Sequence, residues 1–163
     1  MSPQLNPDEQ VLMALDKALK AELTAVHQYL LHSRMCHSWG YSRLAESNRK
    51  ESLEELEHAG LLIDRILFLQ GTPNVTELLP IQNADNVRDQ MQVSLALERD
   101  AVARLNSAVK CAAEAGDNVT RQLFDKILLD EDHHVDYLEG QLHVINDIGI
   151  ESYLARQIDG KSA

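Results

Sequence analysis

Two stretches of the sequence place a glutamate and a histidine where both could bind one metal ion. The pairs are Glu55 with His58 and Glu131 with His134, each three residues apart. Residues at positions i and i+3 of a helix lie on the same face about one turn apart, so both side chains can reach one object. Mixed oxygen and nitrogen ligands suit iron, manganese or zinc, whereas magnesium and calcium sites prefer oxygen alone. A single such pair more often belongs to a solvated helix face, so further ligands are needed.

A repeat in the sequence supplies the further ligands. The separation of the two pairs along the chain equals the separation of Glu22 and Glu98, and each of these two glutamates precedes the glutamate of a pair by the same interval. Both interrupt an apolar stripe with spacings of three and four, which places them on the face expected to be buried. A buried carboxylate is costly unless it is paired or bound to a metal. We therefore predict one metal site built from two equivalent sets: Glu22, Glu55, His58, Glu98, Glu131 and His134.

The charges of these residues fit two divalent metals. Four carboxylates balance four positive charges, and carboxylates can bridge metals and change their binding mode as the charge rises. We expect the glutamates of the two Glu-x-x-His pairs to bridge the metals. The remaining ligands would then bind one metal each, as Glu22 with His58 and as Glu98 with His134.

Other chemically competent residues lie near these six. Some could shift the register or line an entry path, but are assigned to a solvated face: Glu51, Glu54, Glu57, Asp130, Asp132 and His133. Four histidines lack partners at metal-binding spacing and are interpreted as surface or packing residues: His27, His32, His37 and His143. Tyr29 lies two turns after Glu22 on the same stripe, so it could donate an electron to the metals or simply pack in the core.

Long helices have to present these side chains. Apolar periods predict an all-α fold with helices over about 7–37, 41–70, 86–115 and 117–147, and a short amphipathic helix over 150–158. Gly40, Gly71, Gly116 and Gly149 mark the helix ends, and Asp117 can cap the fourth helix. Residues 72–85 lack a helical period, which predicts a long crossover in an antiparallel four-helix bundle. The fifth helix is not needed by a bundle, so we expect it to pack elsewhere, for example on a neighbouring subunit.

Length and composition limit the remaining possibilities. The 163 residues predict one domain, 1–163, with a substantial core. A net charge of −11 argues against nucleic acid and anionic membranes as partners and favours cations. No stretch has the length of a membrane-spanning helix, and residues 1–6 lack signal-peptide features, so we expect a soluble, cytoplasmic protein. Cys36 and Cys111 are isolated and are expected to be reduced packing residues.

Several segments together resemble bacterioferritins, along nearly the whole chain. They are Glu22–Tyr29, Trp39-Gly40, the Glu55-x-x-His58 element, Arg65–Asn74, Leu97-Glu98 and Asp130–His134. The resemblance implies a ferritin-like five-helix subunit, 24 of which form a hollow shell. It also implies that the six residues named above bind iron in a di-iron ferroxidase centre, which oxidises Fe(II) with O2 or H2O2 and stores ferric mineral. Tyr29 matches the tyrosine near that centre.

Two positions depart from the family pattern. Haem-binding relatives use a methionine directly after the bridging glutamate of the second helix, where this chain has Leu56. Leucine cannot ligate iron and the second helix contains no other methionine, so a homomeric shell is expected to lack haem unless a haem-binding partner subunit supplies the ligand. Lys50 replaces a histidine that binds an inner-surface iron in some relatives, and its charge argues against that auxiliary site, although Glu54 remains.

Two alternatives stay open. A metal-silent structural subunit of a mixed shell would explain Leu56, although the complete ligand set argues against it. A di-metal peroxidase of the same fold is the other, although rubrerythrin-like peroxidases normally add a C-x-x-C iron domain that is absent from this sequence.

Overall fold

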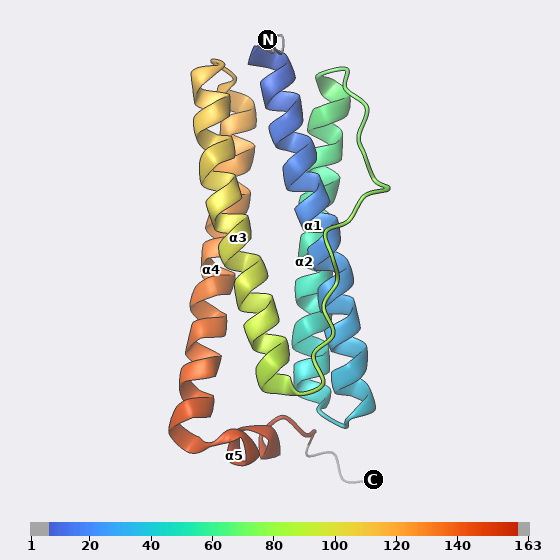
Figure 1. The fold of residues 1–163 in the computed structure, drawn as a ribbon, viewed down its shortest axis with the longest axis vertical. Coiled ribbons are helices and arrows are strands. Elements are labelled where there is room, and N and C mark those ends of the chain that lie inside the picture. The colour runs from blue at the N-terminus through green and yellow to red at the C-terminus, as the bar shows by residue number, and fades with distance from the viewer. Residues whose placement is uncertain (1–6, 160–163) are drawn as a thin grey trace.

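The structure, a computed structural model, describes residues 7–159 and contains five helices in that range. They are α1 (Pro7–Ser38), α2 (Ser42–Phe68), α3 (Val87–Glu114), α4 (Asn118–Ile148) and α5 (Ile150–Ala155). The four long helices run side by side as a bundle, and α5 turns across one end (Figure 1). No strand occurs between residues 7 and 159, and the predicted all-α, ferritin-like bundle is confirmed. Residues 1–6, examined above for signal-peptide features, lie outside the described part.

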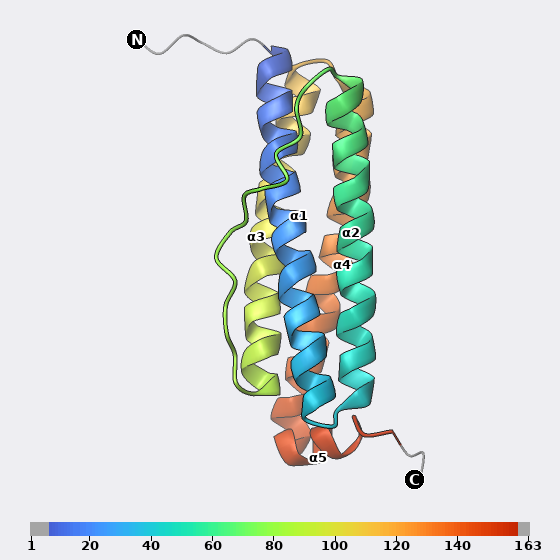
Figure 2. The same ribbon diagram turned by 90° about the vertical axis from the view of Figure 1, so that its right-hand side faces the viewer.

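The crossover between α2 and α3 lies along the outside of the bundle, on the side of α1 and α3 (Figure 2). Side chains of α1 hold its backbone. Thr24 Oγ1 accepts a hydrogen bond from the Leu79 amide at 2.9 Å, and the Gln28 side chain both accepts from the Gln82 amide and donates to the Gln82 carbonyl, each at 2.9 Å. These bonds satisfy backbone groups that have no helical partner. The crossover thereby carries the chain along the bundle, so that α3 runs antiparallel to α1 (Figure 1).

Two apolar clusters fill the bundle, one toward each end. The first combines the beginning of α1 and α4 with the ends of α2 and α3, and is centred on Leu15, Leu62, Leu105 and Phe124. The second lies toward α5 and contains Cys36, Leu44, Val87, Met91, Leu95, Leu138 and Ile145. On every long helix the predicted metal-site residues fall between the residues of these two clusters. The bundle therefore holds the polar site in its middle, away from the helix ends.

Local chemistry explains most helix ends. Asn86 caps α3 by accepting from the Asp89 amide, and Asp117 caps α4, as predicted, by accepting from the Thr120 amide. The end of α2 differs from the prediction. The helix stops at Phe68, and the left-handed conformation expected of Gly71 is taken by Gln70, whose φ is 62°. Gly71 instead lies in close contact with α1, because a Cβ atom there would lie 2.7 Å from Leu12 Cδ2 and the leucine side chain would have to move.

The expectations for the fifth helix need correction. The amides of Arg156 and Gln157 bond to the carbonyls three residues earlier, which tightens the last turn and ends α5 at Ala155 instead of residue 158. The helix also packs on its own bundle, because Tyr153 is 3% exposed within the second cluster and its hydroxyl donates to Gln141 Oε1 at 2.6 Å. Ile150 and Leu154 pack against the same cluster, and the Arg43 amide donates to the Gln157 carbonyl at 3.0 Å, so several contacts together hold this short helix against the bundle.

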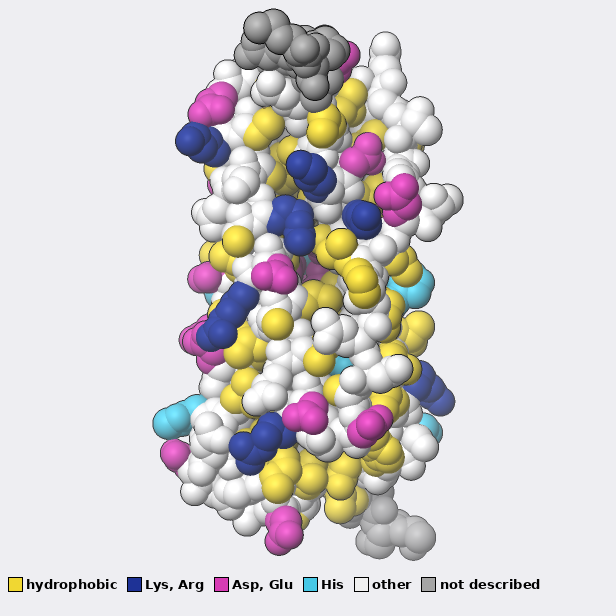
Figure 3. All heavy atoms as spheres, viewed as in Figure 1, with side chains coloured by type: hydrophobic (Ala, Val, Ile, Leu, Met, Phe, Trp, Pro, Cys, Tyr) yellow, Lys and Arg dark blue, Asp and Glu magenta, His cyan; other side chains and the backbone are white. Residues whose placement is uncertain are grey.

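The surface shows charges of both signs. On the face formed by α1, α3 and the crossover, acidic and basic side chains are interspersed among exposed apolar ones (Figure 3). None of the described helices is both long and apolar enough to cross a membrane. Cys36 is buried and Cys111 is partly buried, and both thiols are free, as predicted.

Candidate metal centre

The structure brings all six predicted metal ligands together. Each is buried, with side chains from all four long helices meeting in the middle of the bundle: Glu22, Glu55, His58, Glu98, Glu131 and His134. Their ligand atoms form two groups, in each of which the atoms lie within 4.8 Å of one another. One group contains Glu22 and His58, the other contains Glu98 and His134, and both contain Glu55 and Glu131. Residues from distant parts of the sequence therefore form two adjoining four-residue sites.

The His58 half of the cluster is tightly arranged. His58 Nδ1 lies 3.1 Å from Glu55 Oε2, 3.1 Å from Glu131 Oε1 and 3.3 Å from Glu22 Oε2. Its other nitrogen, Nε2, lies 3.0 Å from Asp130 Oδ2. Asp130 therefore fixes the ring so that Nδ1 faces the other carboxylates, as outer carboxylates commonly do for metal-binding histidines.

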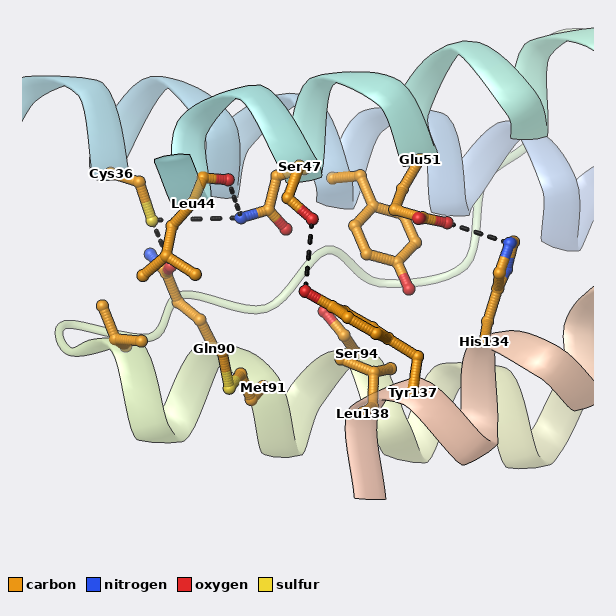
Figure 4. Close-up of a pocket in the computed structure, with 13 residues that line it drawn as sticks. Cys36, Leu44, Ser47, Glu51, Gln90, Met91, Ser94, His134, Tyr137 and Leu138 are labelled. Atoms are coloured by element: carbon orange, nitrogen blue, oxygen red, sulfur yellow. Dashed lines mark hydrogen bonds and ion pairs between the residues drawn. The ribbon is translucent and has the colours of Figure 1, made fainter. Parts of the chain in front are cut away.

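The His134 half is looser on its inner side. His134 Nδ1 lies 3.4 Å from Glu55 Oε1, 3.7 Å from Glu98 Oε1 and 3.9 Å from Glu131 Oε2. On the outer side, His134 Nε2 lies 2.9 Å from Glu51 Oε2 (Figure 4) and 3.5 Å from Glu54 Oε2. This imidazole is therefore also oriented with Nδ1 toward the shared carboxylates.

Sequence reasoning misplaced the residues that orient the two histidines. Asp130 and Glu51 were assigned to a solvated face, but their side chains are only 30% and 23% exposed and contact His58 and His134. Their positions in the sequence could have indicated these contacts, because Glu51 lies one helical turn before Glu55 and Asp130 directly precedes Glu131. Glu54, assigned to the same face, also lies near His134, whereas Glu57, Asp132 and His133 are exposed as expected.

The histidines without metal-spaced partners lie outside the cluster. His27, His37 and His143 are exposed. His32 is fully buried and packs in the core, where its Nε2 lies 2.9 Å from Gln28 Nε2 and its Nδ1 lies 3.3 Å from Ser94 Oγ. Burial lowers the pKa of His32 to about 4, so this ring is neutral at neutral pH.

Burial and close charges strongly perturb the cluster. Burial raises the pKa of Glu22 well above its usual range and that of Glu131 to about 11. Burial alone would also raise the pKa of Glu55, but the close approach of His134 and His58 outweighs it and lowers that pKa to about 2. Burial opposes charge on both histidines, yet the surrounding carboxylates raise their pKa values well above the usual range. Protons therefore compensate the buried negative charge in the metal-free protein.

The donor atoms fit divalent metal ions. Among the described residues, Glu98 Oε2 is buried without a hydrogen-bond partner, and Glu55 Oε1, Glu131 Oε1 and His134 Nδ1 likewise have only ion-pair contacts within the cluster. Buried polar atoms without hydrogen bonds are uncommon in folded proteins and need an explanation. A metal ion between these atoms would explain why they have no hydrogen bonds, because its positive charge would interact with all of them. The mixture of carboxylate oxygen and imidazole nitrogen suits iron, manganese or zinc.

Tyr29 lies against one ligand of the cluster. Its hydroxyl donates a hydrogen bond to Glu98 Oε1, and the side chain is 2% exposed. Burial, reinforced by the charge of Glu98, raises the pKa of Tyr29 well above its usual value, so the phenol stays protonated. Leu56, unlike Tyr29, does not lie in the cluster. It is 51% exposed and its side chain offers no ligand atom.

An antiparallel four-helix bundle with one long crossover and an internal carboxylate–histidine cluster defines the ferritin-like class of proteins. In agreement, the family model for the ferritin-like domain matches residues 12–148.

Individual proteins narrow the assignment. Bacterioferritin of Mycolicibacterium paratuberculosis is 42% identical over 149 residues, which cover 91% of this chain and 94% of that protein. Bacterioferritin of Brucella melitensis is 42% identical over 146 residues, which cover 90% of this chain and 91% of that protein. Bacterioferritin of Rhodobacter capsulatus is 38% identical over 146 residues, with the same shares of the two chains covered. The chain therefore belongs to the bacterioferritin family.

Proposed function

We propose that this chain is a ferroxidase subunit of an iron-storage protein, which oxidises Fe(II) with O2 or H2O2. One observation carries the proposal, namely the two adjoining groups of buried ligand atoms that share Glu55 and Glu131. Shared carboxylates are what a pair of metal ions needs, because each can place one oxygen on either ion. Membership of the bacterioferritin family supports the same conclusion.

In this proposal two Fe(II) ions are the substrate. Glu55 and Glu131 bridge them, Glu22 and His58 complete one binding site, and Glu98 and His134 complete the other. Four carboxylates offset four positive charges, so the protons that compensate the metal-free cluster leave when iron enters. Asp130 and Glu51 keep the two imidazoles turned with Nδ1 toward the metals.

The electron balance of the reaction requires two iron ions. Each Fe(II) gives up one electron, and O2 takes up both electrons and two protons to leave as H2O2. With H2O2 as the oxidant, the same two electrons and two protons give two molecules of water. The ferric product is then hydrolysed and deposited as mineral. Reduction of O2 beyond H2O2 takes further electrons, and Tyr29, which donates a hydrogen bond to Glu98, is placed to supply one of them while it gives up its phenolic proton.

We extend the proposal to the assembly. The chain is expected to form a hollow, cytoplasmic homo-oligomer of 24 subunits, in which the mineral grows. Leu56 does not fit a haem ligand, and no methionine lies in α2, so this shell would be haem-free unless a haem-binding paralogue co-assembles with it. A purely structural role in such a mixed shell is the rival, and the converged, buried ligand set argues against it.

Stepwise iron addition tests the function. The chain is expressed alone and stripped of metal, and aerobic Fe(II) oxidation is followed by optical absorption. We expect a fast phase that saturates at about two irons per chain, then slower mineral growth, with no Soret band. Absence of the fast phase would overturn the ferroxidase assignment and favour the structural subunit.

Substitution on α4 provides the matched test. Glu131→Ala should abolish the fast phase while leaving the shell assembled, as measured by size-exclusion chromatography. Glu139→Ala is the control, because Glu139 lies on the same helix but is exposed and pairs only with Arg99. An unchanged initial rate in Glu131→Ala would refute the ligand assignment.

A further inference from the structure

A small cavity adjoins the His134 half of the cluster. It lies between the long helices, and Glu51 and His134 form its inner end (Figure 4). Tyr29 also lines the cavity. Its volume is about 30 Å³. That is close to the share of liquid volume taken by one water molecule, so the cavity can hold a single very small molecule.

Apolar side chains form the part of the cavity wall that lies away from Glu51 and His134. Leu44 on α2, Met91 on α3 and Leu138 on α4 line it, and all three belong to the second apolar cluster. A hydrated Fe(II) ion would have to exchange its water ligands for hydrocarbon here, which is strongly unfavourable. The cavity is therefore unsuited to the entry of the metal itself.

Several polar groups around the cavity have partners within the bundle, and Glu51 Oε2, which is buried without a hydrogen bond from any described residue, forms an ion pair with His134 Nε2 at 2.9 Å. The Cys36 thiol donates to Gln90 Oε1 at 3.2 Å, and Asn48 Nδ2 donates to the Leu44 carbonyl at 2.9 Å. Ser94 Oγ lies 3.3 Å from His32 Nδ1. Because these groups bond to each other, they leave little demand for water inside. A cavity of this kind favours an apolar occupant.

The outer edge is formed by a contact between two helices. Ser47 Oγ on α2 and the Tyr137 hydroxyl on α4 lie 3.5 Å apart and point toward one another (Figure 4). The Tyr137 side chain is 45% exposed, so one side of this pair faces the surroundings. Small movements of these two side chains would connect the cavity with the outside, while its inner end stays at His134.

We propose that this cavity is the pocket through which dioxygen reaches the metal centre. Dioxygen is apolar, small enough for the space, and is the reactant that must meet the metals without displacing the protein ligands. The proposal rests on the proposed ferroxidase function and adds to it a route for one substrate. It also assigns a direction, since the oxidant would arrive on the His134 side of the cluster.

Filling the cavity tests the route kinetically. Leu44→Phe and, from the opposite wall, Met91→Phe place a ring in the space, and Ile145→Phe is the control because Ile145 lies in the same cluster without lining the cavity. Initial rates of Fe(II) oxidation are measured over a range of dioxygen concentrations. We expect both filling variants to raise the apparent KM for dioxygen about tenfold without changing kcat, and the control to leave KM unchanged.

Hydrogen peroxide separates a blocked route from a damaged site. Because peroxide is polar and does not need apolar walls, its rate should be the same in the wild-type chain and the filling variants. Anaerobic Co(II) titration should show unchanged metal binding. An unchanged KM for dioxygen in correctly folded variants, or an equal loss of rate with both oxidants, would overturn the proposal.

Xenon provides a readout that is independent of iron chemistry. Xenon binds dry apolar cavities, so crystals of the wild-type protein pressurised with xenon should show an atom beside Leu44 and Met91. Crystals of Leu44→Phe should show none. Xenon binding without any effect of filling on KM would refute the route. Absence of the fast phase of Fe(II) oxidation in the wild-type chain would instead refute the proposed function, whether or not xenon binds.

Discussion

The two halves of the cluster carry the same ligand types at equivalent positions of the internal repeat, yet their surroundings differ. His58 Nδ1 lies within 3.3 Å of three carboxylates, whereas the corresponding distances from His134 Nδ1 are 3.4 to 3.9 Å. Glu54 and Asp130 are also equivalent in the repeat, since each directly precedes a bridging glutamate, and they contact the outer nitrogens of His134 and His58. The internal symmetry therefore extends beyond the ligands to the first residues that orient them.

The symmetry ends with the next neighbours. The counterpart of Tyr29 is Leu105 and that of Glu51 is Ile127, both buried apolar residues of the first cluster. The His134 half therefore has an extra carboxylate and a tyrosine beside it. The small cavity adjoins this half, whereas a larger pocket reaches Glu22 and Glu131 on the other half. The comparison teaches that the repeat provides two similar groups of candidate ligands, and that the packing around them is unequal. In the proposed function, this unequal packing would give the two metals unequal roles.

Removing one histidine at a time is the strongest way to break the comparison. His58→Ala and His134→Ala should each lower the fast oxidation rate by about 100-fold or more, because two metals have to act together. Each variant should retain one metal site, so anaerobic Co(II) titration should give about half the wild-type stoichiometry. Retention of two tight sites in either variant would contradict the assignment of one histidine to each metal.

The orienting carboxylates sharpen the comparison. Asp130→Asn should weaken metal binding in the His58 half by about 10- to 100-fold, as loss of an outer hydrogen bond to a ligand commonly does. Glu51→Gln should weaken metal binding in the His134 half by only about tenfold. The reason is that Glu54 lies 3.5 Å from the same His134 nitrogen and can take over the contact. Competition titrations with a chelator measure both constants.

A third variant checks the cause of that difference. If Glu54 does compensate, Glu51→Gln combined with Glu54→Gln should bind metal as weakly as Asp130→Asn. Glu57→Gln is the control, because Glu57 is an exposed glutamate of the same helix. Equal effects of Asp130→Asn and Glu51→Gln alone would contradict the compensation.

The smallest expected effect comes from Tyr29. Tyr29→Phe removes the hydrogen bond to Glu98, and we expect about a fivefold slower fast phase, which corresponds to a loss of about 1 kcal/mol. Metal stoichiometry should stay the same, and a transient tyrosyl radical seen by paramagnetic resonance should disappear.

Tyr153→Phe is the matched control for Tyr29, because Tyr153 is equally buried but donates to Gln141, away from the cluster. It should leave both the rate and the radical signal unchanged. A radical that persists in Tyr29→Phe would assign electron donation to another residue.

The fold could be predicted largely from local signals. Long apolar periods, an Asp117 cap and a crossover without helical period were enough to identify a four-helix bundle, since each signal acts within a few residues. The end of α2 was misread because Gln70, and not Gly71, takes the left-handed conformation, while Gly71 lies in close contact with Leu12. Such a contact joins residues far apart in the sequence and leaves no local pattern.

The sequence by itself determined which six residues are proposed as metal ligands, because helical spacing and an internal repeat are properties of the chain alone. Only the tertiary structure decided what surrounds those ligands. Asp130 and Glu51 look like ordinary solvated carboxylates in the sequence, and their roles follow from helices that approach each other across the bundle. The cavity beside His134 also depends on side chains from several helices. Its shape is set by packing in three dimensions, which residue types and spacings do not encode locally.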